Sequence, residues 1–98
     1  MFVTILTPEE TIFSGAVDSV SVPGAMGAFQ MLNGHAAIVS DLVKGHVRIH
    51  THRTEHIDYD SLHAQLIPHP DDDQILEFPI QGGVVEMKGD KIIVLADA

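Results

Sequence analysis

The chain has 98 residues, which suffice for one domain with a modest hydrophobic core and leave no room for a second domain. Its formal net charge of −9, from 5 basic and 14 acidic residues, would repel nucleic-acid phosphates and anionic lipid headgroups at neutral pH, so neither is expected as a direct partner. The chain has no cysteine, which excludes disulfides and thiolate chemistry, and no apolar run of the roughly 20 residues that cross a bilayer.

Short β-strands with period-2 alternation are expected along most of the chain. In chain order, the expected strands cover residues 2–6, 11–13, 17–22, 29–31, 42–50, 75–80, 84–88 and 91–96. Ser14-Gly15 is expected to be a turn between the second and third strands, and Gly89-Asp90 the turn of a C-terminal hairpin. Residues 51–74 form a long excursion in which only residues 61–66 could make a capped helical turn.

Two strands carry more specific expectations. Val17 is out of phase with Val20 and Val22, which predicts a β-bulge or burial on both faces. In the strand over residues 42–50, Val43, Val47 and Ile49 are expected to share the buried face, opposite Lys44, His46, Arg48 and His50. Many short strands and almost no helix predict an all-β fold, an antiparallel β-sandwich or flattened barrel of about ten short strands, over residues 1–98.

The segment over residues 20–37 is typical of a structural docking loop. Pro23-Gly24 ends a strand, Gly27 permits a tight reversal, and Asn33-Gly34 is a dipeptide favoured in tight turns. None of these residues is an evident nucleophile or acid.

Five motifs occur in a specific order. They are TPEETIFSG from Thr7, VDSVSVPG from Val17, G-x-F-x-x-L-x-G-H-A from Gly27, GHVRI from Gly45, and GGVVEMKGDKIIVLADA from Gly82. In this combination, which covers most of the chain, the sequence resembles the F-type ATP synthase epsilon subunit.

The resemblance implies a noncatalytic subunit of the central stalk, or rotor, that links the gamma subunit to the polar loops of the membrane c-ring. Such a subunit is a β-sandwich that couples ion translocation to ATP synthesis without a cofactor or catalytic residues of its own. It would lie at the cytoplasmic face of the bacterial plasma membrane, held there only through the complex. The positions that match the family's docking end, and are therefore the expected partner interface, are Gly24, Ala25, Met26, Gly27, Ala28, Asn33, Gly34 and His35.

The docking end departs from the family's pattern at three positions. Ala28 stands at a position that is usually acidic, Gln30 at one that is usually glycine, and Asn33 at one that is often proline. The ring loop could therefore differ in polarity, or the contact could rest on backbone groups that the glycines leave accessible. Longer family members continue into a C-terminal helical hairpin that can inhibit ATP hydrolysis. This chain is expected to be the short form, and a truncated chain would have the same sequence.

A metal-responsive β-sandwich is the alternative function. His50 and His52 would share one face of an extended strand, His56 follows, and His63, His69 and Asp71, Asp72 and Asp73 could add ligands. These residues lack a compact ligand signature and a rigid supporting frame, so we expect no functional metal site.

An enzyme is the third hypothesis. His35 follows a tight turn, but the sequence offers no nucleophile, phosphate loop or orienting partner for a catalytic base. We therefore interpret His35 as a turn or interface residue and expect no catalytic residues and no cofactor.

Overall fold

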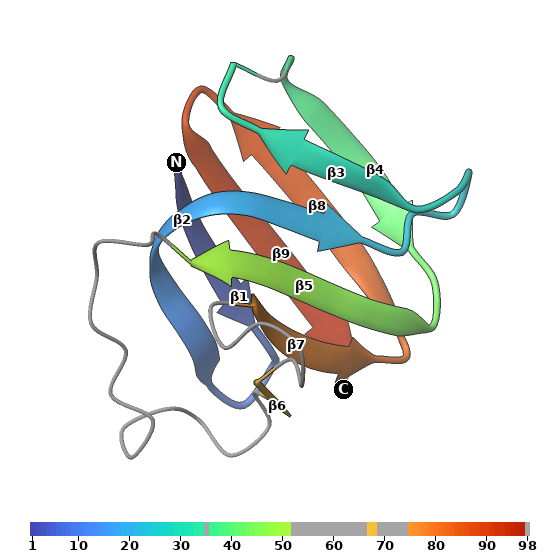
Figure 1. Ribbon diagram of the computed structural model, residues 1–98. Helices are drawn as coiled ribbons and strands as arrows, with labels where there is room; N and C mark the ends of the chain where they lie inside the picture. Colours follow the sequence, from blue (N-terminus) through green and yellow to red (C-terminus); the bar gives the residue numbers. More distant parts are fainter. Residues whose placement is uncertain (35, 52–66, 69–74, 98) are drawn as a thin grey trace.

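The computed structural model describes residues 1–34, 36–51, 67–68 and 75–97 (Figure 1). This part of the chain is all-β, with no helix. Its strands are β1 Phe2–Leu6, β2 Thr11–Val22, β3 Phe29–Leu32, β4 Ile38–Leu42, β5 Gly45–Thr51, β6 Ile67–Pro68, β7 Ile75–Ile80, β8 Gly82–Lys88 and β9 Lys91–Asp97. The helical turn predicted over residues 61–66 lies outside the described residues, as does most of the excursion.

The strands form one strongly curved sheet that folds into two layers. The first layer has the order β4-β8-β9-β1-β2, and the second has β3-β2-β5-β7-β6, so β2 belongs to both. All neighbouring strands are antiparallel except β1 and β9, which are parallel. The predicted fold class, an all-β sandwich or flattened barrel, is confirmed.

β2 joins the two layers as one continuous strand. The prediction of separate strands over residues 11–13 and 17–22 is wrong, because Ser14 and Gly15 pair with Thr4 and Val3 of β1. Gly15 does not adopt a positive φ, so it makes no turn. The bulge predicted from Val17 is confirmed, since the register between β2 and β5 shifts between Val17 and Ser19. At this point β2 leaves the first layer and enters the second, which is visible as its long curve in Figure 1.

The predicted strand over residues 42–50 is two strands in different layers. β4 ends at Leu42 and β5 begins at Gly45, so Val43 lies at a corner and is 48% exposed instead of buried. The corner forms because the Val43 N–H donates to the Pro23 carbonyl at 2.8 Å. Gly45 also lies so close to Pro23 that an added Cβ would come within 2.8 Å of its ring.

The core fills the space between the layers. Inward-facing residues of both layers are almost fully buried, among them Val3 and Ile5 of β1 and the predicted Val47 and Ile49 of β5. The alternation in β9 is strict, with Ile92, Val94 and Ala96 buried and the residues between them exposed. The C-terminal hairpin predicted at Gly89-Asp90 is also confirmed, because Lys88 of β8 pairs with Lys91 of β9.

Candidate functional site

The predicted docking segment over residues 20–37 includes the end of β2 and all of β3. We keep the name docking loop for residues 24–28, which lie between these strands and are fixed by their backbone to the corner between β4 and β5. Gly24 forms a β-bridge with Leu42, and the Ala25 N–H donates to the Asp41 carbonyl at 2.9 Å. A third bond runs within the loop, from the Gly27 N–H to the Gly24 carbonyl at 3.0 Å. The loop is therefore held in one conformation by backbone groups and needs no side-chain hydrogen bonds of its own.

The docking loop presents an apolar, uncharged surface. Ala25, Met26, Gly27 and Ala28 are exposed, and Met26 is 100% exposed at the tip. Gly27 has a φ of 122° and no neighbouring atom where a Cβ would lie, so the turn requires glycine for its backbone conformation and not for space. A long thioether on a tethered loop is suited to packing against an apolar surface of a partner.

The second part of the predicted interface lies at the other end of β3. The docking loop precedes Phe29 and the turn at Asn33 and Gly34 follows Leu32, so the two are separated by a strand of about 13 Å. The turn connects β3 of the second layer to β4 of the first. His35 lies outside the described residues. The docking loop and this turn therefore belong to opposite ends of the sandwich.

The outer surface of the first layer is rich in apolar side chains, which the sequence analysis did not identify as a site. We call this surface the apolar face. It carries the exposed side chains of Val39 (71%), Leu95 (52%), Phe2 (45%) and Ile93 (43%). The half-buried Leu6 and Val84 flank Leu95, and the exposed Glu86 lies between Val39 and Ile93. An exposed patch of this kind on a small domain marks an interaction surface. In the sequence, β9 is apolar at Ile93 and Leu95 as well as at its buried positions, but this pattern does not distinguish an interior surface from an interface.

The outer surface of the second layer is polar by contrast. Arg48 of β5 and Glu77 of β7 form a cross-strand ion pair with an Nε to Oε1 distance of 3.0 Å. The Gln30 side-chain amide donates to the Ser19 hydroxyl at 3.1 Å on the neighbouring strands. The two outer surfaces of the sandwich are thus chemically different, and the apolar one is better suited to a permanent protein contact.

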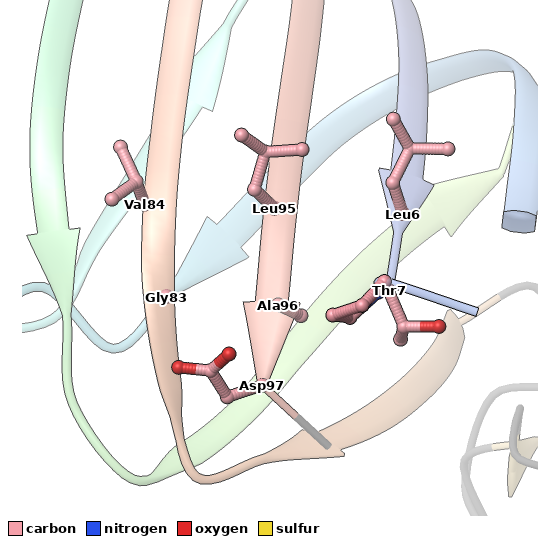
Figure 2. A pocket seen from close by; sticks show the side chains of 8 residues that line it. Leu6, Thr7, Gly83, Val84, Leu95, Ala96 and Asp97 are labelled. Atoms are coloured by element: carbon pink, nitrogen blue, oxygen red, sulfur yellow. The ribbon is translucent and has the colours of Figure 1, made fainter. Parts of the chain in front are cut away.

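A hollow of about 430 Å³ opens at one end of the apolar face (Figure 2). Figure 2 shows Val84, Leu95 and Leu6 in a row across the three adjacent strands β8, β9 and β1. The hollow is completed by Thr7, Pro8, Gly83, Ala96 and Asp97. It lies at the same end of the sandwich as the docking loop, because Gly83 pairs with Leu42, the residue that also bridges Gly24.

Charged side chains are distributed unevenly along the apolar face. Asp41 pairs with Val84 beside the hollow, and Asp97 lines the hollow itself. At the other end, Lys88 pairs with Lys91, which in turn neighbours Phe2. The two ends are about 20 Å apart along β9. Exposed Glu86 lies midway along the face, between Val39 and Ile93, and Asp90 lies in the turn beside Lys91. A partner on this face thus meets carboxylates at the hollow and at its centre, and both lysines only at the other end.

The histidine-based metal site can be followed only in part. His50 is half-buried in β5, whereas His52, His56, His63, His69 and the three aspartates at 71–73 lie outside the described residues. Within the described residues, no three histidine, aspartate or glutamate side chains gather in a group that could hold a metal ion.

No helix in residues 1–34, 36–51, 67–68 and 75–97 is long and apolar enough to cross a membrane.

Comparison with known proteins points to one family. Residues 1–59 match the family described as ATP synthase, Delta/Epsilon chain, beta-sandwich domain. The ATP synthase epsilon chain of Chlorobaculum tepidum is 34% identical over 93 residues, which cover 95% of this chain and 84% of the relative. The ATP synthase epsilon chain of Campylobacter jejuni strain RM1221 is 41% identical over 73 residues, which cover 72% of this chain and 54% of the relative.

Two solved structures share the fold. One is a chain in the central stalk/c-ring structure of the Tetrahymena thermophila mitochondrial ATP synthase, with a TM-score of 0.69 and 15% identity, covering 99% of this chain and 63% of that chain. The other is a chain in the OSCP/F1/c-ring structure of the Euglena gracilis mitochondrial ATP synthase, with a TM-score of 0.72 and 14% identity, covering 98% of this chain and 49% of that chain. At such low identities the likeness concerns the fold.

Proposed function

Because the chain belongs to the delta/epsilon family of ATP synthase chains, through their β-sandwich domain, we propose that it is a noncatalytic rotor subunit of an F-type ATP synthase. The observation that carries the proposal is the similarity to curated epsilon chains over nearly the whole chain. In this role residues 1–98 act as one β-sandwich domain that links the gamma subunit to the c-ring. The same similarity favours this function over a free-standing metal-responsive module.

We assign the gamma subunit to the apolar face. A subunit that must stay attached through every turn of a rotor needs a contact that buries apolar surface, since permanent interfaces are more apolar than transient ones. Phe2, Val39, Ile93 and Leu95 supply that surface on the first layer, whereas the second layer exposes an ion pair and amide groups.

We assign the c-ring to the docking loop. The loop lies beyond the end of the apolar face, so a partner at the loop and a partner on the face can bind together without overlap. Ala28 offers no carboxylate, and the loop's exposed groups are backbone atoms, the alanine methyl groups and the Met26 side chain. We therefore expect the contacted ring loop to be uncharged at this point. The turn at Asn33 and Gly34, with His35, would make a separate contact at the opposite end of β3.

The sandwich would work as a stiff coupling element. Its two layers are joined by the continuous strand β2. Its interior is close-packed, with Val3, Ile5 and Ile49 fully buried. Because β2 belongs to both layers, shear of one layer against the other would strain a covalent strand as well as side-chain packing. Torque from ion movement through the ring can then pass to gamma without slippage. The chain itself makes and breaks no covalent bonds.

In a bacterium, we expect this arrangement to lie at the cytoplasmic face of the plasma membrane. The attachment to the membrane would be indirect and would run through the c-ring. The net charge of −9 supports indirect attachment, because a strongly acidic domain is repelled by anionic lipids.

Binding to the gamma subunit tests the proposal. The full chain should form a stable complex with its cognate purified gamma subunit in gel filtration and in calorimetric titration, with a negative heat-capacity change from apolar burial. Arg48→Leu, on the polar outer surface of the second layer, is the control and should bind gamma as the wild type does. Absence of a complex with the wild-type chain would refute the rotor function.

A further inference from the structure

The hollow at the end of the apolar face has the features of an anchor site for one side chain of a partner. Its volume of about 430 Å³ leaves room for one large side chain, and the hollow is open to solvent on its outer side. Three apolar side chains from three strands, Leu6, Val84 and Leu95, form one wall of it (Figure 2). Anchors that fill such pockets carry most of the binding energy of a protein interface.

The walls of the hollow are held by the sheet. Val84 and Leu95 face each other across β8 and β9, and Leu95 and Leu6 across β9 and β1. On the far side, the Thr7 hydroxyl donates to the Glu10 carbonyl at 3.2 Å, which fixes the turn that follows β1. An incoming side chain therefore meets a preformed site and loses little free energy to reorganisation.

The charges beside the hollow define the chemistry of the occupant. Asp97 lines the hollow and Asp41 lies next to Val84, and within the described residues neither carboxylate makes an ion pair. A third carboxylate, Glu86, lies on the same face between the hollow and the nearest cations, Lys88 and Lys91, which are at the far end of the strands. A complementary partner segment carries a large apolar side chain with basic residues beside it, and acidic or neutral residues about 20 Å away.

We propose that the hollow bounded by Leu6, Val84 and Leu95 receives an apolar side chain from a basic segment of the partner on the apolar face, and that Asp41 and Asp97 fix the direction in which that segment lies. This inference rests on the proposed function, in which the partner is the gamma subunit. It adds to that function the anchor site, the chemistry of the contacting segment and its orientation.

The anchor is tested by truncation of one wall. Leu95→Ala should weaken binding of the full chain to the purified gamma subunit by about tenfold or more, because the occupant loses its apolar contact. The matched control is Leu32→Ala, since Leu32 and Leu95 are both 52% exposed on strands but Leu32 lies in the second layer. Leu6→Ala is a second variant of the same wall. Thermal melting of each variant confirms that it is folded.

The orientation is tested by charge reversal. Asp97→Lys should slow association with gamma about threefold or more at low ionic strength and much less at high salt, because the carboxylate attracts basic residues. Asp18→Lys makes the same change at an exposed position in the bulge of β2 and should leave the rate almost unaltered.

Each outcome has one meaning. The anchor proposal is wrong if Leu95→Ala binds gamma with wild-type affinity, or if Leu95→Ala and Leu32→Ala lose the same amount of affinity. In either case, binding of gamma by the wild-type chain would still support the rotor function. If the wild-type chain does not bind gamma, both the proposed function and this inference are wrong. A dimer of the chain that depends on Leu95 and persists with gamma present would assign the hollow to a second copy, against the proposal.

Discussion

Gly83 is the residue where the sheet is least tolerant of a side chain. Its φ is 147°, and a Cβ built on it would overlap the carbonyl oxygen of Leu95 on the neighbouring strand. The position therefore requires glycine for both backbone conformation and space. Because Gly83 and Leu95 also line the hollow, the close approach of β8 to β9 shapes the proposed anchor site.

Gly83→Ala should destabilise the chain by about 2 kcal/mol or more, through backbone strain and the steric overlap together. For a domain of this size that lowers the melting temperature by roughly 10 °C. Gly27→Ala is the control, because Gly27 also has a positive φ but an added Cβ would meet no atom within 4 Å. Calorimetry measures the melting temperatures of both variants. An equal decrease in the two would show that the overlap with Leu95 is absent.

At the scale of single elements, β2 decides the architecture. Its first part pairs with β1 and its second part with β5 and β3, and the bulge between Val17 and Ser19 redirects the strand from one layer to the other. Ser14 and Gly15 belong to this strand although they are typical turn residues. Pairing with β1 on one side outweighs the local preference of two residues.

Gly15→Ala distinguishes a strand from a turn at this position. Gly15 has no positive φ, and an added Cβ would meet the Phe13 ring at an ordinary distance of 3.4 Å. The variant should therefore be as stable as the wild type or more stable by up to about 1 kcal/mol, because alanine lowers the conformational entropy of the unfolded chain. Urea unfolding measures the difference. A loss of more than about 1 kcal/mol would instead indicate the turn that the sequence favours.

Most elements follow from periodicity, because a half-buried strand shows its buried face as alternation. Val47, Ile49 and the inward residues of β9 could be identified in this way. The division of residues 42–50 into β4 and β5 could not, since it depends on the contact of Gly45 with Pro23, which is distant in sequence. The turn at Gly27 could be predicted from its glycine, whereas the docking role of residues 24–28 stays a prediction. The apolar face could not be predicted, because alternation alone does not separate an interior from an interface.

At the scale of the whole molecule, the sandwich has one apolar and one polar outer surface, and its ends differ. One end carries the docking loop, the corner at Val43 and the hollow, while the other carries the Asn33-Gly34 turn and the β8–β9 hairpin. In the proposed function, this asymmetry would give the domain a defined orientation between gamma and the c-ring.

Restoration of coupling to an ATP synthase complex depleted of this subunit tests the central claim most directly. The wild-type chain should restore proton- or sodium-coupled ATP synthesis in membrane vesicles, and Met26→Leu should match it. Met26→Glu should bind gamma normally but restore coupling to a smaller extent, because a carboxylate at the fully exposed tip of the docking loop opposes an uncharged ring contact. Failure of the wild-type chain to restore synthesis, with gamma and the ring present, would contradict the account.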